Sequence, residues 1–164
     1  MQAIEISGAL LTLIFAAIGA IHMYWALGGR WGGHAALPQM PASAPADQDE
    51  SADATGSGLP GKPVFLPGVA ATIAVALIFL AGAAGCVALL ASPEFRAWRW
   101  SFLSPALGAY VGGAIFLLRV IGDFKYVGFS KTIRGTQFAY RDDRFFSPLC
   151  LVIAVLLLIF ARNL

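Results

Sequence analysis

The sequence predicts an all-α integral membrane protein in which four helices form one bundle. The first observation is composition: 59% of the 164 residues are hydrophobic and 12% are charged, whereas a soluble domain is about 45–50% apolar and about 25% charged. The second is charge placement, because four stretches contain no Asp, Glu, Lys or Arg: residues 6–29, 64–93, 100–118 and 145–161. Together these observations exclude a soluble globule, a nucleic-acid binder, a disordered chain and a disulfide scaffold.

Each uncharged stretch can cross a bilayer as a helix, which takes about 17–25 residues. We expect a single membrane domain over residues 1–164, with spans at about 4–27, 67–91, 104–121 and 146–162. The third and fourth spans begin with Ser104-Pro105 and Ser147-Pro148, pairs that suit a helix cap followed by the first helical residue. No basic segment precedes the first span, which favours an uncleaved anchor over a signal peptide.

Residues 34–66 differ in composition, being rich in Pro, Ala, Ser, Asp and Gly. Such a segment cannot bury enough apolar surface to order itself, so we expect a mobile loop. Its acidic residues match no calcium-loop spacing, and we expect no metal site and no cofactor in the protein. Cys86 and Cys150 fall toward opposite ends of the predicted bundle, which argues against a disulfide between them.

Four spans place both termini on one side of the membrane, and the basic residues are divided unequally between the sides. Three lie on the side of the termini, Arg96, Arg99 and Arg162. The other eight lie on the opposite side: Arg30, Lys62, Arg119, Lys125, Lys131, Arg134, Arg141 and Arg144. The positive-inside rule then predicts a multi-pass protein of the bacterial inner membrane, with both termini outside and the large loops in the cytoplasm.

Polar groups converge at the cytoplasmic end of the predicted bundle and form the candidate ligand-binding site. An ionisable group near hydrocarbon normally faces the bundle interior or has a partner. Gly108, Gly112, Ile115 and Arg119 share one helical face, and the two glycines indicate close helix packing there, which directs Arg119 inward. The candidate residues are His22, Tyr24, Trp25, Arg119, Asp123 and Tyr126.

These residues support two interpretations. In the first, Arg119 holds an anionic group, Asp123 orients Arg119 from four residues away, and His22 or Tyr126 exchanges a hydrogen bond or proton. In the second, Arg119 and Asp123 pair only as a structural contact, and His22 bonds a buried carbonyl. The sequence leaves both open.

Two motifs carry a resemblance to a known family. They span residues 22–32, His-x-Tyr-Trp-Ala-Leu-Gly-Gly-x-Trp-Gly, and 119–129, Arg-x-x-Gly-Asp-Phe-x-Tyr-Val-Gly-Phe; Phe138-Ala139 and Ser147-Pro148-Leu149 follow. At these positions the chain resembles the bacterial family known as domain of unknown function 3995, small four-span membrane proteins. The resemblance implies architecture, and it supplies no activity for the motif residues.

Three functions are compatible with these observations. The favoured one is binding or carrying a small anionic or lipid-like molecule at a polar pocket near one membrane face. The alternative is a structural or regulatory subunit of a membrane complex. A lipid-modifying enzyme with His22 as general acid-base is disfavoured, since no metal set or nucleophile motif accompanies it. The expected partners are the lipid bilayer and either a second copy or another membrane protein; no nucleic acid is expected.

Overall fold

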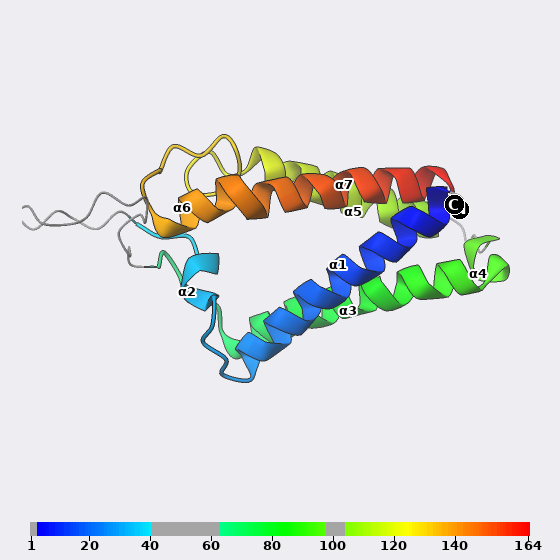
Figure 1. Ribbon diagram of the computed structural model, residues 1–164, viewed down its shortest axis with the longest axis horizontal. Helices are drawn as coiled ribbons and strands as arrows, with labels where there is room; N and C mark the ends of the chain where they lie inside the picture. The colour runs from blue at the N-terminus through cyan, green and yellow to red at the C-terminus, as the bar shows by residue number, and fades with distance from the viewer. Residues whose placement is uncertain (1–2, 41–62, 98–103) are drawn as a thin grey trace, which may run out of the picture.

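A computed structural model describes residues 3–40, 63–97 and 104–164, and over these ranges the chain is helical with no strand, which confirms the predicted all-α class. The long helices are α1 (Ala3–Ala26), α3 (Val69–Ala91), α5 (Pro105–Ile121) and α7 (Ser147–Arg162). The short ones are α2 (Gly33–Ala36), α4 (Pro93–Ala97), α6 (Gln137–Arg141) and the π-helical turn η1 (Asp142–Phe146). Figure 1 shows the four long helices running roughly along one axis.

Three helices are long and apolar enough to cross a membrane: Ala3–Ala26, Val69–Ala91 and the continuous helix Gln137–Arg162. The remaining long helix, α5, is apolar but has 17 residues. Large apolar side chains such as Leu13, Ile78 and Leu118 are exposed along these helices. A soluble protein rarely exposes so much contiguous apolar surface, so the helices fit a membrane protein.

The long helices are arranged as two hairpins, α1 with α3 and α5 with α7, and α1 also contacts α7. Small residues permit the close approach within each hairpin. A Cβ at Gly19 would lie 2.7 Å from the side chain of Leu80, and one at Gly113 would lie 3.2 Å from the side chain of Leu158. The two hairpins are therefore packed internally by backbone-to-side-chain contact.

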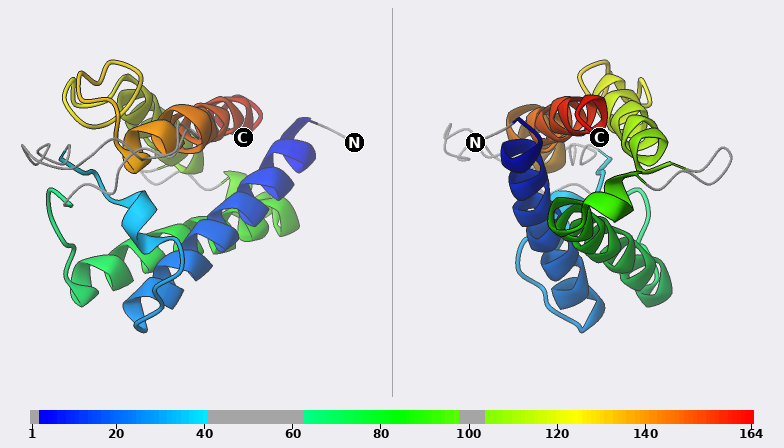
Figure 2. Two further views of the ribbon diagram at one scale, coloured as in Figure 1. Left: turned by 60° about the vertical axis from the view of Figure 1, so that its left-hand side comes forward. Right: turned by 90° about the vertical axis from the view of Figure 1, so that its right-hand side faces the viewer.

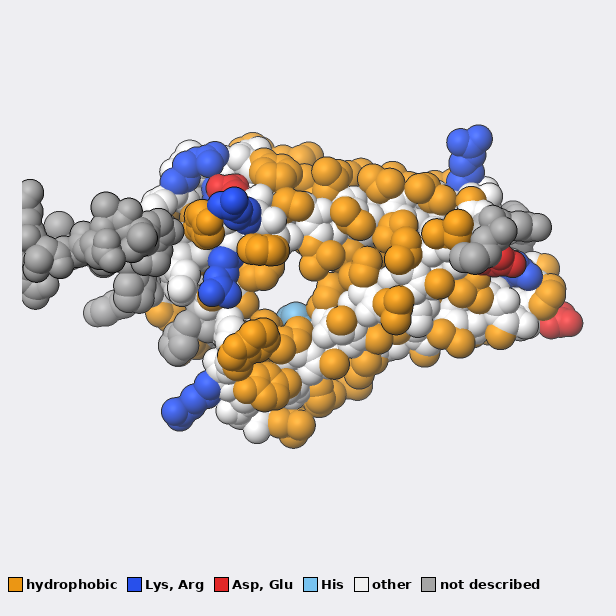
Figure 3. Space-filling model, in the orientation of Figure 1, with side chains coloured by type: hydrophobic (Ala, Val, Ile, Leu, Met, Phe, Trp, Pro, Cys, Tyr) orange, Lys and Arg blue, Asp and Glu red, His pale blue; other side chains and the backbone are white. Residues whose placement is uncertain are grey.

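The hairpins meet at one end and diverge toward the other (Figures 1 and 2). At the end where they meet, near the start of α1 and the end of α7, Leu11, Ile153 and Phe160 are almost completely buried in the core. At the divergent end, α2 contacts α6, and the backbone N–H of Phe138 donates to Oε1 of the buried Gln39. Figure 3 shows the surface hollowed between the hairpins; we call this feature the hollow.

The structure corrects the predicted start of the last helix. The helix runs continuously from Gln137 to Arg162, so Pro148 lies inside it rather than at its first position. Proline lacks an N–H and crowds the carbonyl one turn earlier. The wide turn η1 directly precedes this position, and Ser147 donates its N–H to the carbonyl of Asp142, five residues back.

The predicted inward face of α5 is also corrected. Gly112 packs near Leu157, but a Cβ at Gly108 would meet nothing within 4 Å, and Ile115 is exposed. The closest contact with α7 is made by the buried Gly113 instead. Moving the contact from Gly112 to Gly113 rotates the contact face by about 100° on a helix with 3.6 residues per turn. The spacing of the small residues in the sequence does not fix that rotation.

The two ends of the predicted loop 34–66 are joined to each other by backbone contacts. Gly33–Ala36 is helical, Gln39 forms an isolated β-bridge with Pro63, and the N–H of Val64 donates to the carbonyl of Pro38 at 2.8 Å. Most of the loop that was expected to be mobile, residues 41–62, lies outside the described residues.

Candidate functional site

The partner of Arg119 is Asp142, not Asp123. Nη2 of Arg119 donates to Oδ1 of Asp142 at 2.8 Å, and the Asp142 side chain is completely buried whereas that of Arg119 is 31% exposed. Asp142 lies 23 residues along the chain, in η1. The long-range pair joins the end of α5 to the beginning of the last helix, and it replaces the short-range pair that spacing on one helix predicted.

Lys131 completes this buried ionic cluster. Its side chain is completely buried, and its Nζ donates to Oδ2 of Asp142 at 3.1 Å, to the carbonyl of Gly128 at 3.0 Å and to Oδ1 of Asp143. An ammonium group has three N–H donors, so all three are used. The four side chains of this ionic cluster, Arg119, Lys131, Asp142 and Asp143, carry two charges of each sign, which makes burial of the group tolerable.

Asp123 organises the loop that brings Lys131 to Asp142. Its Oδ1 accepts the backbone N–H groups of Lys125, Tyr126 and Val127 at 2.9, 2.7 and 2.9 Å. Partial burial raises the pKa of Asp123, but these three backbone donors outweigh it and hold the pKa below its ordinary value. The carboxylate is exposed and is engaged by its own loop, so it does not orient Arg119.

Two glycines make the loop after α5 compact. Gly122 and Gly128 have φ of 93° and 81°, and a Cβ on Gly122 would lie 1.7 Å from the carbonyl oxygen of Val127. Only glycine fits this combination of left-handed backbone and backbone contact. The loop thus returns on the helix end and directs the N–H of Gly128 to Oδ2 of Asp142 at 2.8 Å.

The first motif forms a similar return at the end of α1. The indole Nε1 of Trp25 donates to the carbonyl of Trp31 at 2.8 Å, and the Trp31 N–H reaches the Tyr24 hydroxyl at 3.4 Å. A Cβ on Gly29 would lie 2.3 Å from atoms of the Tyr24 ring. Tyr24 and Trp25 therefore fix the path of the chain after α1, a structural use that the motif alone does not reveal.

The six predicted residues lie in two groups, and no contact joins the groups among the described residues. His22, Tyr24 and Trp25 belong to the hairpin of α1, while Arg119, Asp123 and Tyr126 belong to that of α5. Tyr126 is half-buried, with the Lys125 ammonium 5.2 Å from its ring centroid. Sequence reasoning missed Lys131 and gave Asp142 and Asp143 no partner, although two adjacent acids before an apolar helix were a usable signal.

His22 contacts the aromatic residues between the hairpins. Its ring stacks on Phe79 at 6.0 Å between centroids and meets the edge of Trp25 at 5.1 Å. Phe79 in turn lies 6.2 Å from Phe116 of the other hairpin, and Phe15 contacts both phenylalanines. This aromatic cluster of Phe15, Phe79, Phe116, His22 and Trp25 extends from the junction of the hairpins toward the divergent end.

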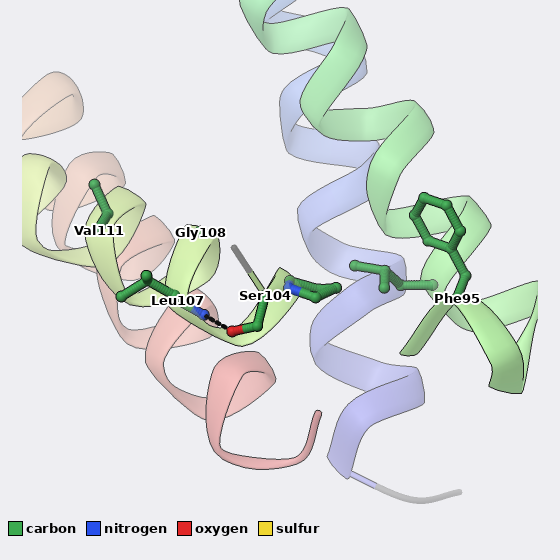
Figure 4. A pocket seen from close by; sticks show the side chains of 7 residues that line it. Phe95, Ser104, Leu107, Gly108 and Val111 are labelled. Carbon is green, nitrogen blue, oxygen red and sulfur yellow. Dashed lines mark hydrogen bonds between the residues drawn. The ribbon is translucent and has the colours of Figure 1, made fainter. Parts of the chain in front are cut away.

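A second concave region of about 480 Å³ lies at the opposite end, between α3, α4 and α5 (Figure 4). Leu89, Phe95, Leu107 and Val111 line it, and the Ser104 hydroxyl accepts the N–H of Leu107 as a helix cap. Its described lining is apolar apart from Ser104, and residues 98–103, which precede Ser104, are outside the described part of the chain. Among the described residues no group of His, Cys, Asp and Glu could hold a metal ion.

Replacing Asp142 is expected to destabilise the protein strongly. Asp142→Asn leaves the fully buried Lys131 and the Arg119 guanidinium with too little negative charge, a loss of about 3–5 kcal/mol for a broken buried pair. Asp143→Asn is the matched control, because Asp143 is 37% exposed, so that its loss should cost less than the loss of the fully buried Asp142. Thermal unfolding midpoints in detergent measure both; equal midpoints for the two variants would contradict a structural role for Asp142.

Replacing Asp123 should produce a pH-dependent loss. Asp123→Ala removes the acceptor of three N–H groups, at a cost of about 1 kcal/mol, as for a helix cap. Because the folded pKa is lowered, the wild-type carboxylate stabilises the fold above its ordinary pKa of about 3.9 and loses this effect as the pH falls through the lower folded value. The gap between the unfolding midpoints of wild type and Asp123→Ala should therefore narrow from pH 7 to pH 3. A constant gap would show that the carboxylate charge is not involved.

Comparison with known proteins gives one match. Residues 15–157 match the family model described as Protein of unknown function (DUF3995). No curated protein and no solved structure matches the chain. The matched region contains both motif loops, the ionic cluster and the aromatic cluster. The match covers most of the chain, and the protein therefore belongs to the family Protein of unknown function (DUF3995).

Proposed function

We propose that this protein is a multi-span membrane protein that binds a lipid-like molecule in the hollow between its two hairpins. The observation that carries the proposal is the shape in Figure 3, where hydrophobic side chains wall a concave surface between diverging helix pairs. The rings of Phe79 and Phe116 lie 6.2 Å apart and bring α3 of one hairpin next to α5 of the other. Binding sites for small molecules are concave and mostly apolar, with few polar groups.

The structure supports the lipid-like ligand better than the small anion. Nη2 of Arg119 is engaged by Asp142, and the positive charges of Arg119 and Lys131 are balanced by the two aspartates. One guanidinium nitrogen, Nη1, is buried with no hydrogen-bond partner among the described residues. A guanidinium that is already paired with a carboxylate is a weaker anion receptor than one whose charge is not neutralised.

The alternative role, a structural or regulatory subunit, is favoured by the same ionic cluster. The ammonium of Lys131 and both carboxylate oxygens of Asp142 form their hydrogen bonds within the chain. Their function on this view is to fix the junction of α5 with the last helix, while exposed apolar surface contacts another membrane protein or a second copy.

The proposal includes four membrane crossings in the bacterial inner membrane. The 17 residues of α5 extend roughly 26 Å at 1.5 Å per residue, close to a hydrocarbon thickness of about 30 Å, and mismatch of this size is accommodated by local thinning. Among the described residues, exposed basic side chains are more numerous at the divergent end, with Arg30, Lys125, Arg134, Arg141 and Arg144, than at the other, with Arg162 exposed and Arg96 half-buried. This distribution supports a cytoplasmic divergent end with both termini outside.

Photolabelling tests the binding proposal. Wild-type protein in nanodiscs is mixed with a diazirine-bearing fatty alcohol, irradiated, and mapped by mass spectrometry. Labelling of peptides that contain His22, Phe79 and Phe116 should saturate and be competed by unlabelled lipid. The exposed residue Val152 of α7, which lies on a separate peptide, serves as the internal control, since contact with bulk lipid does not saturate. Non-saturating labelling at all sites would reject the binding site and favour the subunit role.

Cysteine labelling tests the crossings and their direction. In a Cys86→Ala, Cys150→Ala background, we place one cysteine before α5 by Glu94→Cys and one after it by Lys125→Cys; both positions are exposed. In intact cells an impermeant maleimide should label the first and not the second until the membrane is permeabilised. The reverse pattern would invert the orientation. Equal labelling of both in intact cells would show that α5 does not cross.

A further inference from the structure

The backbone of α1 fixes the tautomer of His22. Nδ1 lies 2.8 Å from the carbonyl oxygen of Ile18, one turn earlier on the same helix. A carbonyl oxygen only accepts hydrogen bonds, so Nδ1 must carry the proton and donate it. In the neutral ring the second nitrogen, Nε2, then has a lone pair and no hydrogen. It can accept a hydrogen bond and cannot donate one.

The surroundings of His22 leave its second ring nitrogen without a hydrogen-bond partner in the described part of the chain. The half-buried ring contacts Phe79 and Trp25, and no acidic side chain is paired with it among the described residues. The neighbouring aromatic groups supply no hydrogen bond to Nε2, because the Trp25 N–H is directed to the carbonyl of Trp31. Nε2 therefore has no hydrogen-bond partner in the described part of the chain.

We infer that Nε2 of His22 accepts a hydrogen bond from a hydroxyl group of the ligand, so that the hollow selects apolar molecules bearing an O–H donor, such as long-chain alcohols. This inference rests on the proposed binding of a lipid-like molecule in the hollow. An ether or ketone of the same size presents only acceptors, and a lone pair facing a lone pair forms no bond. The imidazole thus supplies the polar group that orients a ligand held mainly by apolar contact.

Competition between matched ligands tests this selection. Hexadecan-1-ol and 1-methoxyhexadecane differ in one O–H donor, and each is titrated against the photolabel in nanodiscs containing wild type or His22→Phe. In wild type the alcohol should compete about tenfold better than the ether, the effect of one hydrogen bond in an apolar site. In His22→Phe, which keeps an aromatic ring against Phe79, the two should compete equally.

Nitrogen NMR supplies a readout that does not depend on a variant. In a His34→Gln protein labelled with 15N-histidine, the single remaining ring reports His22. Its spectrum should show a protonated Nδ1 and an unprotonated Nε2, and the Nε2 signal should move upfield with hexadecan-1-ol and stay in place with 1-methoxyhexadecane.

The outcomes separate this inference from the binding proposal. If alcohol and ether compete equally in wild type and neither moves the Nε2 signal, the hollow binds lipid but His22 does not select it, and the inference is wrong. A protonated Nε2 in the free protein would also overturn it. If neither compound competes and labelling does not saturate, the binding site itself is rejected and the selection by His22 is rejected with it.

Discussion

The buried carboxylate of Asp142 is the contact on which one half of the structure depends. Its two oxygens receive Arg119 from α5, the Gly128 N–H from the following loop and the Lys131 ammonium. Three segments that lie apart in sequence are joined at one carboxylate, whose side chain is completely buried together with that of Lys131. Because a buried charge is costly unless fully paired, this arrangement tolerates little displacement, and it fixes the position of α5 against the last helix.

The motif of residues 119–129 forms the loop that assembles the contacts to Asp142. Gly122 and Gly128 allow a return too tight for any side chain, and Asp123 holds the intervening N–H groups. The motif thus specifies the shape of a loop that directs the Gly128 N–H and the Lys131 ammonium to Asp142. The loop after α1 uses Tyr24 and Trp25 in a comparable way. Both motifs therefore stabilise the loops that follow helices. Residue type alone does not distinguish this structural use from a binding site.

Helix positions were predictable because they depend on local sequence, whereas the pairing at the site was not. Uncharged stretches located the long helices to within a few residues, and Ser104-Pro105 marked the start of α5, since apolar length and capping are local properties. The ion pair of Arg119 spans 23 residues, and spacing along one helix favoured Asp123 instead. Which acid reaches Arg119 depends on the geometry of the loop and on the helical turn η1 that precedes Pro148. The spacing of residues in the sequence reveals neither feature.

The ionic cluster and the aromatic cluster differ in the hydrogen-bonding groups that they leave without a partner. At the ionic cluster the charges neutralise one another, and only Nη1 of Arg119 and the hydroxyl of Ser147 lack partners among buried atoms of the described residues. In the aromatic cluster, by contrast, the half-buried His22 directs one nitrogen to its own helix and keeps a lone pair on the other. A satisfied network stabilises structure, while an acceptor without a partner is open to a donor from outside the chain. On the proposed function, chemical selection therefore belongs to the end of α1, whereas the hydrogen bond of Arg119 to Asp142 joins α5 to the last helix.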